Sequence, residues 1–296
     1  MGNSDKSKDD FASKAMAFSL EVKCYSGQRM DKSVTDNVHA RSNANKNSGR
    51  YNKNLFPNSK SLKYAQKMAR SLRETFAFHT MPWQSHGVRV LPVANFVEFN
   101  QDMEDAKAEF LKASQFFING YQQEIAAASR DFSALGHLFD LDDYPDASQV
   151  AGLFDTKLSP KPIVRGNDFR VKLSDKVLEQ LKTDYENDFR DAQEVANRDL
   201  WRRMETVVQA MRDRLSDPKA IFRDSLVGNI RELVNVMDGL NVFDDAQLRA
   251  FTDEVRDNLT ESEPQCLRDD ANARKYQADK ANDILSRIQA ANVSSD

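Results

Sequence analysis

The chain of 296 residues has little cysteine, proline and glycine, and each shortage excludes a class of protein. Its two cysteines, Cys24 and Cys266, lie far apart, so they form neither a disulfide framework nor a CxxC motif. Only 10 Gly and 8 Pro exclude a collagen-like chain and favour helices. No apolar run approaches the roughly 20 residues of a membrane span, and the N-terminus lacks the apolar centre of a signal peptide. We therefore expect a helix-rich protein of a reducing, cytoplasmic compartment with no membrane partner.

Catalytic motifs are also missing. The phosphate-binding patterns GxxxxGKS/T and GxGxxG, the nucleophile pattern GxSxG and the zinc pattern HExxH do not occur. His79 and His86 flank Pro82-Trp83, and we interpret them as packed side chains. The acidic pairs at 142–143, 244–245 and 269–270 fall at predicted turns and helix starts, where Asp caps free N–H groups. The sequence thus predicts a non-enzymatic protein with no cofactor and no metal, unless scattered carboxylates meet in space.

Charge is distributed unevenly along the chain. The whole protein has a net charge of -4, with 40% hydrophobic and 30% charged residues, which is typical of a globular protein. Residues 21–90 carry a net charge of +9, whereas residues 91–296 carry -13. Two regions of opposite electrostatic character therefore share one chain.

Helical periodicity dominates the chain from residue 59 onwards. Apolar residues at steps of three and four predict helices over 59–78, 96–132 and 174–215. Further helices are predicted over 147–154, from Asp217-Pro218 to Gly239, from Asp244 to Leu259 and after Pro264. The last of these is weakly apolar between 268 and 283, which predicts an exposed or bound middle. Because long amphipathic helices bury their apolar faces against one another, we expect antiparallel packing.

Three short segments, 18–24, 88–91 and 169–173, alternate apolar and polar residues as strands do. The predicted fold class is mainly α (α+β), an elongated bundle of long antiparallel helices with a small three-stranded sheet. We expect four segments: a disordered tail over 1–17, a basic α+β module over 18–92, a long-helix bundle over 93–260 with a strand near 168–173, and a polar C-terminal helix over 261–296. The Asn-rich stretch 41–54 is predicted to be a basic surface loop.

The basic segment between residues 23 and 89 carries the functional hypothesis. Its cations are interleaved with aromatic residues, and single-stranded nucleic-acid sites use cations for phosphates and aromatic faces for bases. Four of the cations step by three and four along one helix face. The candidate nucleic-acid-binding residues are Arg50, Lys53, Lys60, Lys63, Lys67, Arg70, Tyr51, Tyr64 and Trp83.

Two alternatives stay open. In the first alternative, the basic face docks on the protein's own acidic helical body or on a partner, with Phe76, Phe78 and Trp83 in the core. The regular spacing over 96–132 also permits a coiled-coil seam and a homo-oligomer. Bulky Phe and Tyr at seam positions favour packing within the chain.

Parts of the chain resemble a known family. WQSHGVRVLP at 83–92, DFRVKL at 168–173 and the paired long helices are similar to a bacteriophage and plasmid family of unknown function. Its members are encoded near MoxR-type AAA+ ATPases and von Willebrand A-domain proteins, and the resemblance covers residues 18–260. It implies a phage accessory protein that acts in the host cytoplasm with an AAA+ ATPase as partner. It implies no catalytic residues.

The sequence therefore supports one main hypothesis, an accessory binding protein whose basic aromatic module engages nucleic acid, single strands in preference. The competing hypothesis is a protein adaptor or assembly factor. It would work with a MoxR-type AAA+ ATPase and use the helical body, especially 261–296, as its docking surface.

Overall fold

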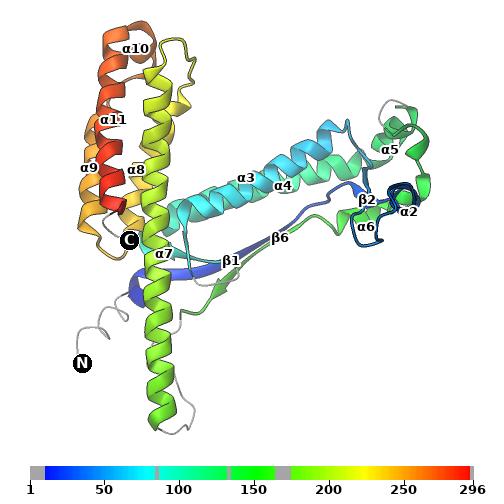
Figure 1. Ribbon diagram of the computed structural model, residues 1–296, viewed down its shortest axis with the longest axis horizontal. Helices are drawn as coiled ribbons and strands as arrows, with labels where there is room; N and C mark the ends of the chain where they lie inside the picture. Colours follow the sequence, from blue (N-terminus) through cyan, green and yellow to red (C-terminus); the bar gives the residue numbers. More distant parts are fainter. Residues whose placement is uncertain (1–10, 84–86, 132–134, 164–174, 294–296) are drawn as a thin grey trace. The chain divides into compact units, whose positions relative to one another are not determined.

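The computed structural model describes residues 11–83, 87–131, 135–163 and 175–293, which are mainly helical with a small sheet (Figure 1). The chain forms two compact units. Unit 1 comprises Met1–Ser19, Ala77–Phe99 and Ser159–Asp296, and unit 2 comprises Leu20–Phe76 and Asn100–Leu158. These boundaries differ from the four segments expected from the sequence. No described helix is long and apolar enough to cross a lipid bilayer.

Four strands form the larger sheet, in the order β4-β5-β1-β6. The strands are β1 (Ala15–Lys23), β4 (Met81–Pro82), β5 (Val88–Pro92) and β6 (Asp155–Lys161). β1 pairs antiparallel with β5, and β5 pairs antiparallel with β4. Two of the three predicted strands are therefore present as neighbours, whereas the third, 169–173, lies outside the described residues. β6 was not predicted because Pro160 interrupts its pattern, and proline is tolerated on an edge strand.

The chain is anchored in unit 1 from residue 11 onwards. Phe11, Ala15 and Ala17 are 2–4% exposed. The ring of Phe11 stacks on Trp83 with the centroids 4.7 Å apart. Residues 11–17 therefore differ from the expected disordered tail, because one aromatic ring and two small residues are enough to bury this short segment. Residues 1–10 lie outside the described part of the chain.

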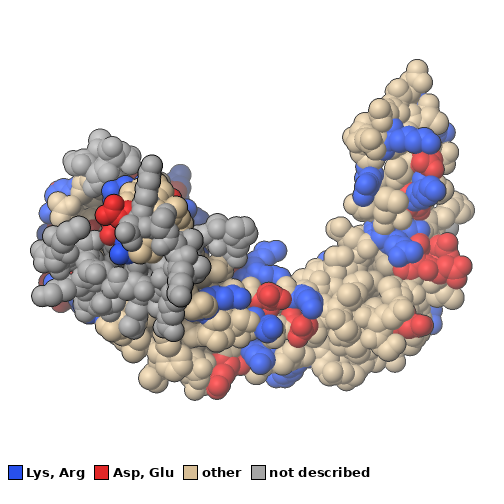
Figure 2. Space-filling view, turned by 90° about the horizontal axis from the view of Figure 1, so that it is seen from below, with Lys and Arg blue, Asp and Glu red and all other residues tan. Residues whose placement is uncertain are grey.

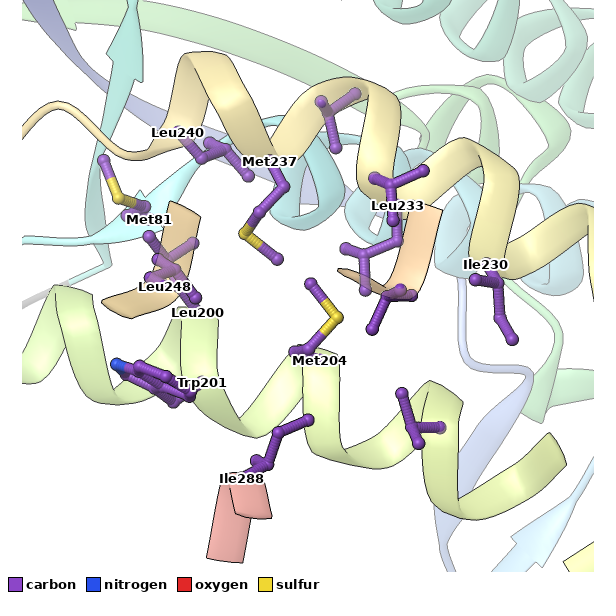
Figure 3. Packing of buried hydrophobic residues seen from close by; sticks show 14 of the residues in the cluster. Met81, Leu200, Trp201, Met204, Ile230, Leu233, Met237, Leu240, Leu248 and Ile288 are labelled. Carbon is purple, nitrogen blue, oxygen red and sulfur yellow. The ribbon is translucent and has the colours of Figure 1, made fainter. Parts of the chain in front are cut away.

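Helices form the body of unit 1. They are α7 (Asp175–Ser216), α8 (Ser225–Leu240), α9 (Ala246–Leu259), α10 (Pro264–Asp269) and α11 (Ala271–Val293). α11 runs antiparallel to α7, since Arg274 reaches the carbonyl oxygen of Leu215 and Gln289 reaches Glu205. In Figure 3, Met204 of α7 and Met237 of α8 point toward each other in the buried apolar cluster. The long helices thus bury their apolar faces against one another, as their periodicity predicts.

Two helix starts differ from the predictions. Asp217-Pro218 forms a turn, with the Ala220 N–H donating to the Asp217 carbonyl at 3.0 Å, and α8 begins only at Ser225. α9 is capped by Asp245, whose carboxylate accepts from the backbone of Gln247 and Leu248, rather than by Asp244. Asp is therefore the right cap type for α9, one residue later than predicted, whereas no Asp side chain caps the start of α8.

One face of the middle of α11 is packed, and the opposite face is exposed, as the sequence predicts. Gln277 is 3% exposed and donates to the Asn258 carbonyl at 2.6 Å. Ala278 and Ala281 are also buried. The low apolar content between 268 and 283 reflects small residues and a hydrogen-bonded glutamine, which allow α11 to approach its neighbours closely.

Unit 2 contains shorter elements and the larger parts of two long helices. They are β2 (Gln28–Met30), α2 (Lys32–Ser42), β3 (Asn52–Asn54), α3 (Lys60–His79), α4 (Phe96–Asn119), α5 (Tyr121–Arg130) and α6 (Ala147–Ala151). The predicted helix 59–78 is confirmed as α3. The predicted helix 96–132 is interrupted at Gly120, which separates α4 from α5. The predicted loop 41–54 contains the end of α2 and strand β3, which pairs with β2.

An aromatic cluster holds unit 2 together. The ring of Phe56 contacts the rings of Phe117, Tyr121 and Tyr144, with centroids 5.2–5.7 Å apart. The hydroxyl of Tyr144 donates to the Leu55 carbonyl at 3.0 Å. Burial raises the pKa of Tyr144 to about 12. This cluster fixes the turn that leads from β3 into α3, and it thereby positions the basic helix described next.

Candidate nucleic-acid interface

Four cations form a stripe on α3 of unit 2. Because each helical residue turns by about 100°, Lys60, Lys63, Lys67 and Arg70 fall within an arc of about 80°. All four are exposed, and none of them forms an ion pair with a carboxylate in the part of the chain that the structure describes. The stripe is about 15 Å long, at 1.5 Å per residue. We call these four residues the α3 stripe.

The start of α3 is electropositive beyond these side chains. Ser59 caps the helix by accepting a hydrogen bond from the Leu62 N–H at 3.0 Å, and the first turn contains no acidic residue. The helix dipole places partial positive charge at this end, so Lys60 and Lys63 cost the helix a few tenths to about 1 kcal/mol each. Lys63 Nζ donates to the Pro57 carbonyl at 2.5 Å and its side chain stays exposed. The helix itself therefore gains no stability from these two cations.

Two of the three predicted stacking rings are accessible. Tyr64 follows Lys63 on α3 and is 45% exposed, and Tyr51 is 39% exposed. Tyr51 and Arg50 line a hollow of about 370 Å³ between α2 and the loop before β3. The backbone there is fixed, because the Tyr51 N–H donates to Thr35 Oγ1 at 3.0 Å and His39 Nε2 lies 3.0 Å from the Gly49 carbonyl oxygen. Arg50 and Tyr51 are therefore presented by an ordered loop.

Lys53 serves the fold rather than the surface. Its side chain is 5% exposed, lies 3.2 Å from Asp31 and pairs with Asp143. Its Nζ also donates to the Leu138 carbonyl at 2.9 Å. Burial acts to lower the pKa of Lys53, but the hydrogen bonds and charges of Asp143 and Asp31 outweigh it and hold the pKa above its usual value. Lys53, which the sequence placed among the phosphate contacts, has no group left for a phosphate.

Trp83 also departs from its predicted role. It belongs to unit 1 and is 3% exposed. Its ring stacks on Phe11 and Phe243 and meets Phe189 edge-on with the centroids 5.4 Å apart. Both of its faces are covered by protein, so it offers none to a base. The residues that remain as candidates are Arg50, Tyr51, Tyr64 and the α3 stripe, all of unit 2.

The acidic half of unit 2 nearly balances the basic half. Residues 20–76 carry a net charge of +8 and residues 100–158 carry -7. On the face shown in Figure 2, basic and acidic side chains are interspersed rather than gathered by sign. Two carboxylates of this half have other cations as partners: Asp143 faces Lys53 and Arg29, and Asp155 faces Lys23. The α3 stripe thus remains a local basic surface in a nearly neutral unit.

Sequence reasoning missed a larger groove in unit 2, of about 570 Å³. Its lining comes from the end of β1 and the turn after it, from α3, and from the region around α6. The residues that line it are Val22, Lys23, Cys24, Tyr25, Ser26, Gln28, Arg29, Leu55, Arg73, Asp143, Pro145 and Leu153. The lining residues extend from Val22 to Leu153 and come from separate segments, so no local pattern in the sequence signals the groove. Burial raises the pKa of the Cys24 thiol, and this effect outweighs the charge of Arg73, which acts to lower the pKa. This cysteine is therefore not an activated nucleophile.

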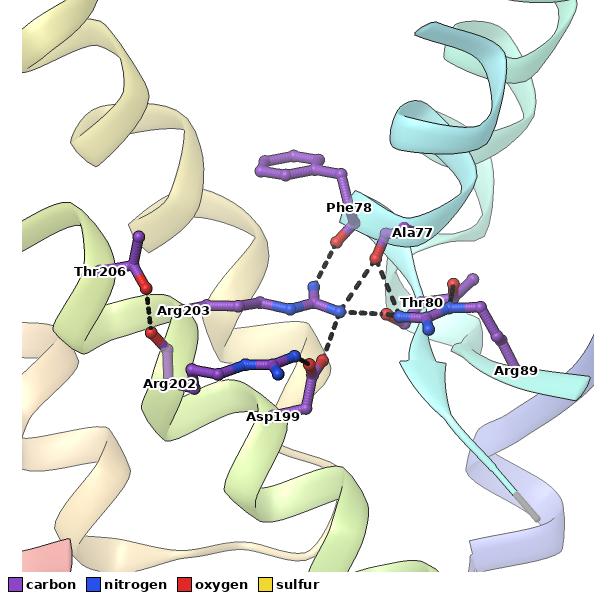
Figure 4. Close-up of polar contacts among 8 residues, drawn as sticks. All are labelled: Ala77, Phe78, Thr80, Arg89, Asp199, Arg202, Arg203 and Thr206. Carbon is purple, nitrogen blue, oxygen red and sulfur yellow. Dashed lines mark hydrogen bonds and ion pairs between the residues drawn. The ribbon is translucent and has the colours of Figure 1, made fainter. Parts of the chain in front are cut away.

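Unit 1 holds a second polar cluster, which is structural (Figure 4). The guanidinium groups of Arg89 and Arg203 both donate to the carbonyl oxygens of Ala77 and Thr80 at the end of α3. Burial and the charge of Arg203 lower the pKa of Arg89 to about 10. Both guanidinium groups are directed at protein carbonyls that a helix end leaves without intrahelical partners, so the cluster closes a helix rather than binding a ligand.

The described residues contain no group of three or more His, Cys, Asp or Glu side chains that could hold a metal ion. The acidic pairs of the sequence lie at helix starts and in ion pairs instead. Asp270, for example, accepts from the Asn272 N–H at 2.8 Å at the start of α11. His79 is buried among the rings of Phe78 and Phe99, and His86 lies outside the described residues.

A scan against protein-family models, a search of curated proteins and a search of solved structures each gave no match for this chain. The function is therefore argued from the site alone.

Proposed function

We propose that this protein is a non-enzymatic accessory protein that binds single-stranded nucleic acid through unit 2. The α3 stripe contacts successive phosphates, and the accessible rings of Tyr64 and Tyr51 stack on bases, with Arg50 as a further phosphate contact. The observation that carries the proposal is a row of four exposed cations, without a described carboxylate partner, on one face of a helix.

The contacts of the acidic residues give less support to the alternative in which the basic face of α3 docks on the protein's own acidic helices. Glu124 accepts a hydrogen bond from Ser61, Asp131 accepts from Asn58 at 2.6 Å, and Asp143 is occupied by Lys53. These acidic groups come close to α3 and the turn before it, and they still do not meet the stripe. Glu74 is exposed one turn after Arg70 on α3, so it offsets part of the charge at the C-terminal end of the stripe. The engaged acidic groups leave the rest of that charge for an external polyanion.

The test is fluorescence anisotropy of the full chain with a labelled single strand of about 30 nucleotides, titrated with salt. Each phosphate contact steepens the log-log salt slope by roughly 0.7, so replacing the α3 stripe by Glu is expected to abolish binding or to remove up to about three units of slope. Tyr64→Ala is expected to weaken binding by about 1–3 kcal/mol at an unchanged slope.

A matched control is available in the same unit. The control set consists of four exposed cations outside the stripe. Replacing these four by Glu changes the net charge of unit 2 by the same amount as the stripe variant does. The control residues are Lys107, Lys112, Arg130 and Lys157. Full binding by the control and loss by the stripe variant support the proposal. Equal loss by both variants assigns the effect to net charge, and full binding by the stripe variant refutes the proposal.

The adaptor hypothesis depends on unit 1 and receives less support. One face of the middle of α11 is packed, so only its exposed face is left for an AAA+ ATPase. Ile221 and Tyr276 are 91% and 62% exposed, which makes them positions where a partner contact of unit 1 can be tested. Ile221→Asp with Tyr276→Asp is a cleaner test than deleting α11, because the deletion removes part of the core. Loss of a co-purified ATPase from this variant would favour the adaptor.

A further inference from the structure

The 570 Å³ groove of unit 2 has the size and lining of a ligand site. Small-molecule sites usually measure about 300–1,000 Å³ and combine apolar walls with a few polar groups. Leu55, Pro145 and Leu153 supply the apolar wall, and Arg29 and Arg73 supply cations. No ligand chemistry was assigned to this groove by the sequence.

The groove adjoins the C-terminal end of the α3 stripe. Arg73 lies three residues after Arg70, and residues three apart are neighbours on a helix surface. Gln66 shares the Arg73 side of α3, and its amide donates to the carbonyl oxygens of Tyr25 and Ser26 at 3.2 Å. This side of α3 therefore holds the turn after β1 against the helix, next to the stripe.

The charges of the groove favour an anion. Arg73 uses one N–H for the Val22 carbonyl at 2.7 Å and another for the Ala69 carbonyl at 3.2 Å, which leaves further N–H groups of its five. Asp143, the one acidic group in the lining, is paired with the buried Lys53. Arg29 lies 3.7 Å from Asp143 with 58% of its side chain exposed, so it too can turn to a ligand.

The same contacts argue against an extended peptide. A peptide that extends a strand needs unpaired backbone groups on the protein. The carbonyl oxygens of Val22, Tyr25 and Ser26 already accept hydrogen bonds from Arg73 and Gln66. The groove thus offers side-chain cations and apolar walls rather than an open strand edge.

We propose that the groove takes one unstacked nucleotide, with its base against Pro145 and Leu153 and its phosphate near Arg29 and Arg73. This inference rests on the proposed function, since the nucleotide belongs to the strand whose phosphates run along the α3 stripe. It explains a preference for single strands, because a paired base cannot leave its stack without an energetic cost.

The test fills the groove without touching the stripe. Leu153→Trp places a large ring in the groove, and Leu111→Trp on α4 is the matched control, because both leucines are 43% exposed and only Leu153 lines the groove. Thermal unfolding must be the same for both variants and the wild type. We expect Leu153→Trp to weaken single-strand binding by about tenfold, the range of one base contact, with duplex binding unaffected. The log-log salt slope should fall by no more than roughly 0.7, the share of one phosphate contact.

Mononucleotides separate this inference from the proposed function. AMP, CMP, GMP and UMP are each titrated at millimolar concentration and followed by saturation-transfer NMR. Saturation transfer to a mononucleotide from the wild type and from Leu111→Trp, but not from Leu153→Trp, supports the groove even if long strands do not bind. Wild-type strand affinity in Leu153→Trp together with a defective stripe variant overturns the groove and leaves the proposed function intact. Loss of a protein partner in Leu153→Trp, with nucleic-acid binding unchanged, makes the groove a peptide site and also overturns the inference.

Discussion

Asp199 and Arg203 lie one turn apart on α7, with Asp199 Oδ2 2.6 Å from Arg203 Nη2. Asp199 is 7% exposed, and Arg203 donates to the carbonyl oxygens of Ala77, Phe78 and Thr80. Burial lowers the pKa of Arg203, and the charge of Asp199 opposes that effect. Asp199 therefore compensates the charge of the buried Arg203 guanidinium, which donates hydrogen bonds to the carbonyl oxygens at the end of α3.

Asp199→Asn is expected to destabilise unit 1 strongly. The amide cannot neutralise Arg203, and an uncompensated charge inside a protein costs about 3–5 kcal/mol. Urea unfolding of the full chain measures this loss as a lower transition midpoint. Asp191→Asn is the control, because Asp191 is exposed on the same helix and its replacement should change stability by less than about 0.5 kcal/mol. Equal, small effects of the two variants would contradict a structural role for the pair.

Lys53→Met is expected to separate structural cations from binding cations. The variant leaves Asp31 and Asp143 facing each other in a buried site and should cost unit 2 about 3–5 kcal/mol. Lys46→Met, in the same basic segment but exposed, should leave stability unchanged. Denaturant unfolding of both variants is the measurement. Full stability of Lys53→Met together with weaker nucleic-acid binding would return Lys53 to the interface.

The pH dependence of unit 2 follows from groups whose pKa values rise on folding. The pKa of Lys53 lies above its ordinary 10.5, so its contribution to stability is complete below that value and is lost as pH rises through the folded-state pKa. Burial raises the pKa of Tyr144 from 10 to about 12, and it also raises those of Tyr25 and Tyr121. We therefore expect stability to fall above about pH 10.

Alkaline titration followed by phenolate absorbance checks this expectation. Three of the seven tyrosines should ionise only together with the loss of near-ultraviolet circular dichroism. Tyr144→Phe should remove one of the three and break the hydrogen bond to the Leu55 carbonyl, at a cost of about 1–3 kcal/mol. Ionisation of all seven tyrosines while the dichroism persists would show that the cluster is open to hydroxide.

Helix placement could be predicted because it depends on spacing along the chain. Of the apolar positions predicted for α3, Leu62, Ala65, Leu72 and Phe76 are buried and Met68 is partly buried, and the α3 stripe falls on the opposite, exposed side. The α3 stripe was therefore visible in the sequence. The end of one long predicted helix at Gly120 was missed, because its apolar spacing continues across the break.

The fates of Lys53 and Trp83 could not be predicted, since they depend on partners that are distant in sequence. Lys53 is buried only because Asp143 arrives from 90 residues further along the chain. Trp83 is covered by Phe11, Phe189 and Phe243, from three separate segments. The 570 Å³ groove of unit 2 is likewise formed by segments that are distant in sequence. Local patterns reveal faces of elements, whereas the neighbours that cover or complete those faces are set by the tertiary fold.

Two glycines of α8 provide a matched test of the packing in unit 1. A Cβ on Gly239 would overlap the side-chain amide of Asn95, with Nδ2 at 2.8 Å, and this amide donates to the Val236 carbonyl at 3.0 Å. Gly239→Ala should therefore expel the amide and cost about 1–3 kcal/mol. A Cβ on Gly228 meets no atom within 4 Å, so Gly228→Ala should stabilise the helix by about 0.5–1 kcal/mol. Urea midpoints that shift in opposite directions confirm the contact, and Asn95→Ala should remove most of the Gly239→Ala penalty. Two shifts toward higher stability would show that Asn95 does not occupy this position.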